Sequence, residues 1–179
     1  MSSIKVWDLF VRVFHWSTAL LFLSNYWITE PGSQIHRYIG YTLIALVLAR
    51  ILWGFVGSTY ARFRSFVPTP TTLFGYLRAL RHGKHPYYLS HNPLGALMVL
   101  FLLVMLLVTG TTGWLLTTEM FEAEEWLEGL HELCANLVMV AVGFHIAAVI
   151  WVTHAAKERL VPAMWDGMKP EQAPAEKNR

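Results

Sequence analysis

Four long apolar stretches constrain the fold of this chain more than any other feature of its sequence. A helix needs about 20 apolar residues to cross a hydrocarbon core about 30 Å thick. The stretches that reach this length run over residues 8–29, 37–57, 94–117 and 130–155. With 55% hydrophobic and only 15% charged residues, the chain is too apolar for a soluble domain. The sequence therefore predicts an all-α integral membrane protein built as a bundle of four transmembrane helices.

The first stretch differs from the others because Asp8 and Arg12 lie inside it. Such charges can reach the interface by snorkelling, and Trp7 beside them is typical of a membrane boundary. A signal peptide is the alternative for this segment. No small-residue cleavage site follows, however, and the segment contains His15 and two tryptophans, so we expect it to be the first span.

Charged residues separate between the loops. Residues 58–92 contain five basic residues and no acidic residue, whereas residues 118–128 contain five glutamates and no basic residue. The positive-inside rule then predicts that the basic loop and both termini are cytoplasmic. A solvated loop is the default interpretation of the glutamates, and docking of a basic partner protein is the alternative. The net charge of +2 indicates no nucleic-acid partner.

The chain is expected to form one membrane domain over residues 1–169. Within the basic loop, the segment TTLFGYLRALRHG predicts a short helix at the membrane surface. Residues 170–179 have the composition of a disordered cytoplasmic tail. The single cysteine, Cys134, excludes an internal disulfide and a covalent CxxCH haem attachment, and we expect it to be a small buried apolar group.

Histidines inside the apolar stretches are the strongest indication of function, because an imidazole in hydrocarbon is costly unless it has a partner. His131 and His145 are fourteen residues apart on one predicted helix, which places them about 21 Å apart along the axis and about 40° apart around it. His36 lies at the outer end of the second stretch, level with His131. His15 lies about two turns into the first stretch, level with His145. The sequence therefore predicts an outer pair, His36 with His131, and an inner pair, His15 with His145.

Two imidazole pairs at two depths suit two non-covalent b haems. Neutral imidazole is a good axial ligand for haem iron, and the apolar porphyrin plate fits between helices in lipid. We expect Arg50 at the inner level and Arg37 at the outer level to pair with the haem propionates. Small residues allow a flat plate to approach closely, and those available are Gly40, Gly110, Gly113 and Gly143.

The other four histidines are not predicted to be haem ligands. His82, His85 and His91 lie in the basic loop, where a solvated role is the default. His154 follows His145 by nine residues, about half a turn around the helix, and therefore faces elsewhere. A zinc or copper site needs three or four ligands within a few ångströms of one another, and His131 and His145 are too far apart to share one ion.

Four segments resemble the bacterial cytochrome b561 and nickel-hydrogenase b-type cytochrome family, especially its short members. They are KVWDLFVRVFHW, IHRYIGYTLIALVLARILWGFVGSTYARF, HNPLGALMV and LHELCANLVMVAVGFHIAAV. The closing VPAMWDGMKP is similar to the family's ending, with Gly-Met-Lys in place of the common Gly-Arg-Lys. The resemblance covers residues 5–169 and implies a four-helix membrane bundle with two b haems. The family's ligands match His15, His36, His131 and His145.

The resemblance also implies a location and a role. It indicates a multi-pass protein of the bacterial cytoplasmic (inner) membrane that carries electrons between a quinone pool and a redox partner, such as a cytochrome c or a dehydrogenase or hydrogenase subunit. In some members a further histidine lies near a bound quinone, and His154 is offset from that pattern.

Bis-histidine ligation leaves no open position at iron, so we assign no catalytic residue and favour an electron relay over a stand-alone enzyme. Two alternatives remain. The first is a stand-alone quinone-linked oxidoreductase that acts on a small periplasmic reductant such as superoxide. The second is a haem-free metal transporter or membrane anchor.

Overall fold

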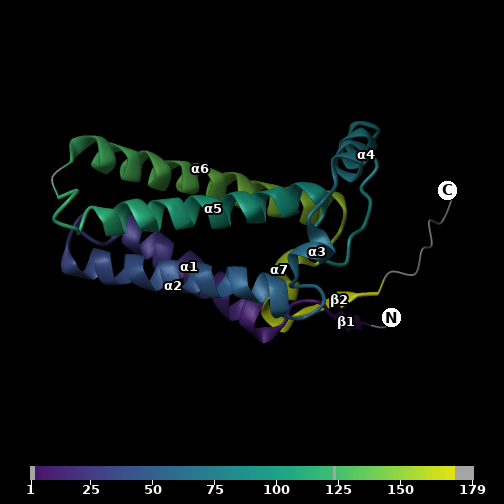
Figure 1. Ribbon diagram of the computed structural model, residues 1–179. Coiled ribbons are helices and arrows are strands. Elements are labelled where there is room, and N and C mark those ends of the chain that lie inside the picture. Colours follow the sequence, from purple (N-terminus) through teal and green to yellow (C-terminus); the bar gives the residue numbers. More distant parts are fainter. Residues whose placement is uncertain (1–2, 123, 172–179) are drawn as a thin grey trace, which may run out of the picture.

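The computed structural model describes residues 3–122 and 124–171. The four long helices, which run side by side in Figure 1, are α1 (Leu9–Trp27), α2 (Gln34–Val56), α5 (Pro93–Leu115) and α6 (Glu125–Ala155). By length and composition α2, α5 and α6 can each cross a membrane. α1 has 19 residues, and polar side chains such as Arg12 and His15 lower its hydropathy. Three of the four predicted spans therefore qualify, and the crossing of α1 stays a prediction.

The ends of the long helices follow from local capping. Asp8, Ser33 and Asn92 precede α1, α2 and α5, and each side chain accepts a hydrogen bond from a backbone N–H in the first turn. α6 begins before the predicted start at residue 130. Its first turn contains Glu125 and Glu128, and carboxylates are favourable at the positive end of the helix dipole. Part of the acidic stretch is therefore helical rather than loop.

Packing between the long helices is uneven. α1 packs on α2, α2 on α5 and α5 on α6, whereas among the described residues the backbone of α6 stays farther from α1 and α2. α2 and α5 come together because Gly110 has no side chain: a Cβ there would overlap Ile44. Phe22, Leu43 and Val138 form the buried core where α1, α2 and α6 face one another. α6 is thus packed closely on α5 and spaced more widely from α1 and α2.

The short elements gather at one end of the bundle in Figure 1. They are β1 (Ser3–Lys5), α3 (Phe63–Phe66), α4 (Pro70–Arg81), α7 (Leu160–Asp166) and β2 (Met168–Pro170). β1 pairs with β2 in antiparallel register, with Ile4 opposite Lys169. α4 confirms the short helix that was predicted in the basic loop. The predicted tail falls almost entirely on residues 172–179, which lie outside the described residues.

A buried lysine holds the C-terminal strand against the rest of this end. Lys169 is only 1% exposed. Its Nζ donates to the carbonyl of Tyr88 at 2.9 Å, lies 3.2 Å from Oε2 of Glu158, and sits over the ring of Tyr87 at 5.0 Å from the centroid. A buried charge is tolerated only when it is paired in this way. The lysine of the Gly-Met-Lys ending is therefore a structural residue.

Candidate functional site

The fold brings four histidines together as two facing pairs. The ring centroids of His36 and His131 lie 6.2 Å apart, and those of His15 and His145 lie 6.3 Å apart. A metal–imidazole bond is about 2.0 Å long and a ring centroid lies about 1.1 Å beyond its nitrogen, so imidazoles on opposite sides of one metal ion have centroids about 6 Å apart. Each pair therefore has the separation that a single metal ion between its two rings requires.

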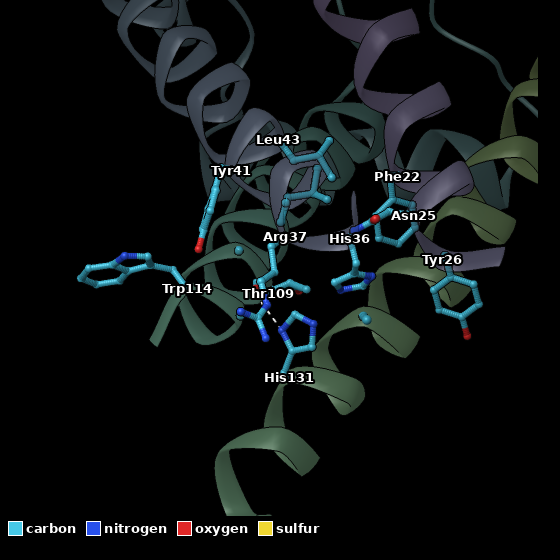
Figure 2. Close-up of a pocket in the computed structure, with 15 residues that line it drawn as sticks. Phe22, Asn25, Tyr26, His36, Arg37, Tyr41, Leu43, Thr109, Trp114 and His131 are labelled. Carbon is cyan, nitrogen blue, oxygen red and sulfur yellow. Dashed lines mark hydrogen bonds between the residues drawn. The ribbon is translucent and has the colours of Figure 1, made fainter. Parts of the chain in front are cut away.

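Hydrogen bonds orient His131 of the outer pair. Its Nδ1 lies 2.9 Å from the carbonyl oxygen of Thr109, the contact drawn as a dashed line in Figure 2, and 3.1 Å from Oγ1 of Thr112. Because a carbonyl oxygen can only accept, Nδ1 carries the proton and donates it to Thr109. The lone pair is then on Nε2, where a neutral imidazole binds a metal.

His36 is oriented in the same sense through a hydroxyl group. Its Nδ1 lies 3.1 Å from Oγ1 of Thr29, and that hydroxyl donates to the carbonyl of Asn25 at 2.8 Å. Since the hydroxyl has a single hydrogen, Oγ1 accepts from His36 and leaves its Nε2 with the lone pair. Sequence reasoning missed Thr29, Thr109 and Thr112. Their contacts with the histidines join separate segments of the chain, so no sequence pattern indicated them.

A mainly apolar pocket surrounds the outer pair, and Figure 2 shows both imidazoles within it. A Cβ on Gly113 would lie 2.8 Å from Cε1 of His131, so only glycine leaves the ring in its place. A Cβ on Gly40 would meet no atom within 4 Å. Arg37 lines the same pocket, is exposed, and donates from Nε to the carbonyl of Gly32 at 3.0 Å. The pocket thus combines two imidazoles, open space beside a glycine, and a cation.

Buried polar atoms without partners mark the inner end of the bundle. Among the described residues, Nδ1 of His15, Oγ1 of Thr18 and Nη1 of Arg50 are buried and have no hydrogen-bond partner. Arg50 is 3% exposed, and its Nη2 donates to the carbonyl of Ala61 at 3.2 Å. Such atoms are rare because each one costs free energy. Asp8 acts on this guanidinium through its charge, and a carboxylate oxygen is a further acceptor that Nη1 fits.

His91 corrects the expectation of a solvated histidine. Its ring is enclosed between Trp7 and Phe66, with 4.7 Å between its centroid and each of theirs. Burial, which is the largest cause, and nearby positive groups together lower the pKa of His91 to about 3, so the imidazole is neutral at physiological pH. The groups that act on it through charge are, in decreasing order, Arg50, Lys169, His145 and His15. His91 is therefore an enclosed, neutral residue rather than a solvated one.

The remaining residues that the sequence singled out are not members of the two facing pairs. His154 is exposed, and its Nδ1 contacts the carbonyl of Ile150 in its own helix at 2.8 Å. Gly143 is exposed, and a Cβ there would meet no atom within 4 Å. Cys134 is buried, as predicted. Within the part of the chain that the structure describes, no three His, Cys, Asp or Glu side chains converge on a metal-ion site.

Long apolar helices and the paired histidines define the class: a multi-pass membrane protein with two pairs of imidazoles, each spaced for one metal ion between its rings. The prokaryotic cytochrome b561 family matches residues 6–167, and the chain therefore belongs to this family. Membership indicates transmembrane electron transfer through haem b.

One relative is a probable Ni/Fe-hydrogenase B-type cytochrome subunit from Rhizobium leguminosarum bv. viciae. It is 25% identical in an alignment that covers 92% of this chain and 88% of that protein. No solved structure matches the chain significantly.

Proposed function

We propose that this protein carries electrons across the bacterial inner membrane through two b haems, one held by His15 and His145 and the other by His36 and His131. The observation that carries the proposal is the equal separation of the two pairs, 6.3 Å and 6.2 Å between ring centroids. Two pairs drawn from three helices share the one distance that axial imidazoles need. The orientation of His131 and His36 by hydrogen bonds at Nδ1, which leaves Nε2 free to bind a metal, supports the same proposal.

The placement of the pairs supports a relay rather than a single centre. His131 and His145 are fourteen residues apart on α6, which corresponds to about 21 Å along the helix axis. Haem supplies reversible one-electron chemistry when bound, and the protein holds and tunes it. The hydrogen bond from Nδ1 of His131 to Thr109 holds the ring and leaves the lone pair on Nε2. Because two imidazoles would hold each of the two haems, we assign no catalytic side chain to these sites.

Arginines and glycines complete the proposed sites. Arg50 at the inner end has a buried Nη1 without a partner in the described structure, which a propionate oxygen would satisfy. Arg37 has the corresponding position in the outer pocket. A fixed positive charge raises the reduction potential of its haem, because reduction adds an electron. The open space beside Gly40 and Gly143 allows close approach of the plate.

The proposed route joins a quinone pool to a redox partner protein, with lipid around the bundle. The relative from Rhizobium is named as a hydrogenase subunit, which favours a hydrogenase subunit as the partner. A cytochrome c or another dehydrogenase subunit would fulfil the same role. Glutamates at the end of the bundle that holds the outer pair offer a basic partner a surface of opposite charge.

The proposal is tested by spectra of the protein purified in mild detergent. We expect the α band of b-type haem in the reduced-minus-oxidised spectrum and two haems per chain. Alanine at His36 or His131 should remove one haem, and alanine at His15 or His145 should remove the other. His154→Ala, a change at an exposed histidine, should retain both. A colourless protein would refute the function, and a haem lost only on substitution of His131 and His145 together would refute the pairing.

A further inference from the structure

α4 carries an exposed surface that neither histidine pair uses. The side of α4 that faces the rest of the protein carries Tyr76, which is 6% exposed. Its ring meets the ring of Tyr88 edge-on, with 5.7 Å between centroids. On the opposite side of α4, which faces away from the protein, Phe74 is 68% exposed and Leu77 is 40% exposed. Two large apolar side chains on one side of a short helix mark a surface that is suited to contact something other than water.

Cations flank these apolar side chains. With 100° between successive residues, Leu77, Arg81, Phe74 and Arg78 follow one another within about 100° of arc on α4. All four are exposed, and a shallow groove is lined by three of them together with His82. Apolar side chains bordered by guanidinium groups are typical of a helix that lies in the membrane interface.

Arg78 and Arg81 have no acidic partner in the described part of the chain. Residues 58–92 contain no acidic residue that could neutralise them locally. In the described part of the chain, the salt bridges join Arg159 to Asp166 and Lys169 to Glu158, and neither includes Arg78 or Arg81. The surface of α4 is therefore cationic and apolar at once.

The position of α4 matches the membrane boundary. In Figure 1 it stands beyond the end of α5 and α6, on the side of the bundle away from α1 and α2. Just after α4, the ring of His85 contacts Trp151 of α6 edge-on, with 5.4 Å between centroids. Trp151 is 51% exposed on an apolar helix, and exposed tryptophans of membrane helices concentrate at the interface. This contact places the segment that follows α4 at the level of the lipid headgroups.

We propose that α4 binds an anionic phospholipid of the cytoplasmic leaflet, with Phe74 and Leu77 in the boundary between headgroups and acyl chains and Arg78 and Arg81 on the phosphate. This rests on the membrane topology of the proposed function. Guanidinium groups bind phosphate in a bidentate manner. A lipid is favoured over a soluble protein because the cations share one side of α4 with the exposed apolar side chains, and because Trp151 fixes the depth.

The experiment uses the full chain in nanodiscs of phosphatidylcholine, alone or mixed with phosphatidylglycerol. A spin label at Phe74→Cys, in a Cys134→Ala background, reports contact with oxygen in lipid or with a nickel chelate in water. The matched label at Thr72→Cys lies about 160° around α4 and is also exposed. We expect lipid contact for the label at position 74 in the mixed discs and water contact for the label at position 72.

Lipid retention tests the headgroup. Phosphatidylglycerol that remains with the purified protein is counted against phosphatidylcholine by native mass spectrometry. Each basic residue near an anionic surface contributes about 1 kcal/mol, so the preference should fall about fivefold for each arginine removed in Arg78→Gln/Arg81→Gln. Arg64→Gln/Lys84→Gln removes the same charge from exposed positions of the same loop and should retain most of the preference.

Two results would overturn the lipid site. One is a label at position 74 that the nickel chelate reaches equally in both kinds of disc. The other is protection at position 74 that is independent of headgroup charge or persists in detergent without lipid, which would indicate a protein contact. Haem content of the same samples is read separately. Samples without haem but with a protected position 74 would refute only the proposed function, and the converse would refute only the lipid site.

Discussion

Gly113→Ala tests the geometry of the outer pair directly. A Cβ at this position would lie 2.8 Å from Cε1 and 3.2 Å from Nδ1 of His131. Carbon atoms in contact are separated by about 3.5 Å, so the imidazole must move by about 0.7 Å to accept the methyl group. The ring is held by a 2.9 Å hydrogen bond to the carbonyl of Thr109, and a shift of that size would break or lengthen this bond beyond its normal range.

The expected magnitude follows from these contacts. Overpacking at a well-packed position costs about 1–3 kcal/mol. If the cost falls on the binding geometry of His131, affinity for the outer haem falls about 5- to 150-fold. Alanine is favoured over glycine in a helix by about 1 kcal/mol. This gain offsets part of the cost of overpacking, so the overall stability of the protein is expected to change little. The outer haem should therefore be lost or shifted in potential while the inner haem is unaffected.

Gly129→Ala is the matched control, because Gly129 lies two residues before His131 on α6 and an added Cβ there would meet no atom within 4 Å. Haem content and a redox titration followed at the haem α band measure both variants. The control should retain both haems at unchanged potentials. A Gly113→Ala protein with both haems at wild-type content and potential would refute the claim that Gly113 sets the position of His131.

Three further predictions concern the inner end of the bundle. Lys169→Met leaves Glu158 with a buried charge and no cation, so the free energy of unfolding should fall by about 3 kcal/mol. The control Arg159→Met removes an exposed ion pair and should lower it by less than about 1 kcal/mol. Equal shifts of the two melting temperatures, measured by circular dichroism, would contradict this. The pKa of His91 is about 3 in the folded protein, against the ordinary value of 6.5 for an exposed histidine. Below pH 6.5, therefore, His91 binds a proton in the unfolded chain but not in the folded one. The free energy of unfolding should then decrease by up to about 1.4 kcal/mol for each pH unit toward acid. His91→Asn should reduce this dependence in melts at pH 7 and 5.5. An equal dependence on pH in the variant and the wild type would show that His91 is not responsible. Arg50→Gln should lower the reduction potential of the inner haem and leave the outer one unchanged in a redox titration, whereas an equal shift of both would place Arg50 elsewhere.

The sequence by itself determined the helices and the levels of the histidines. Apolar length alone predicts α2, α5 and α6, since a membrane helix must satisfy its backbone internally over a fixed thickness. The spacing of fourteen residues between His131 and His145 gives their separation along α6, because the rise and turn of a helix are constant. Which histidines stand at the same depth follows from chain direction through the bundle, and the predicted pairs are the ones whose rings face each other in the structure.

Contacts across helices were decided by the tertiary structure. The proton on Nδ1 of His131 depends on a carbonyl of α5, and the need for glycine at position 113 depends on where that imidazole lies. His91 was misjudged because a histidine in a basic loop carries no local sign that Trp7 and Phe66 will enclose it. Spacing along one helix is a property of the backbone and can be calculated, whereas burial and hydrogen-bond partners exist only once separate segments pack together.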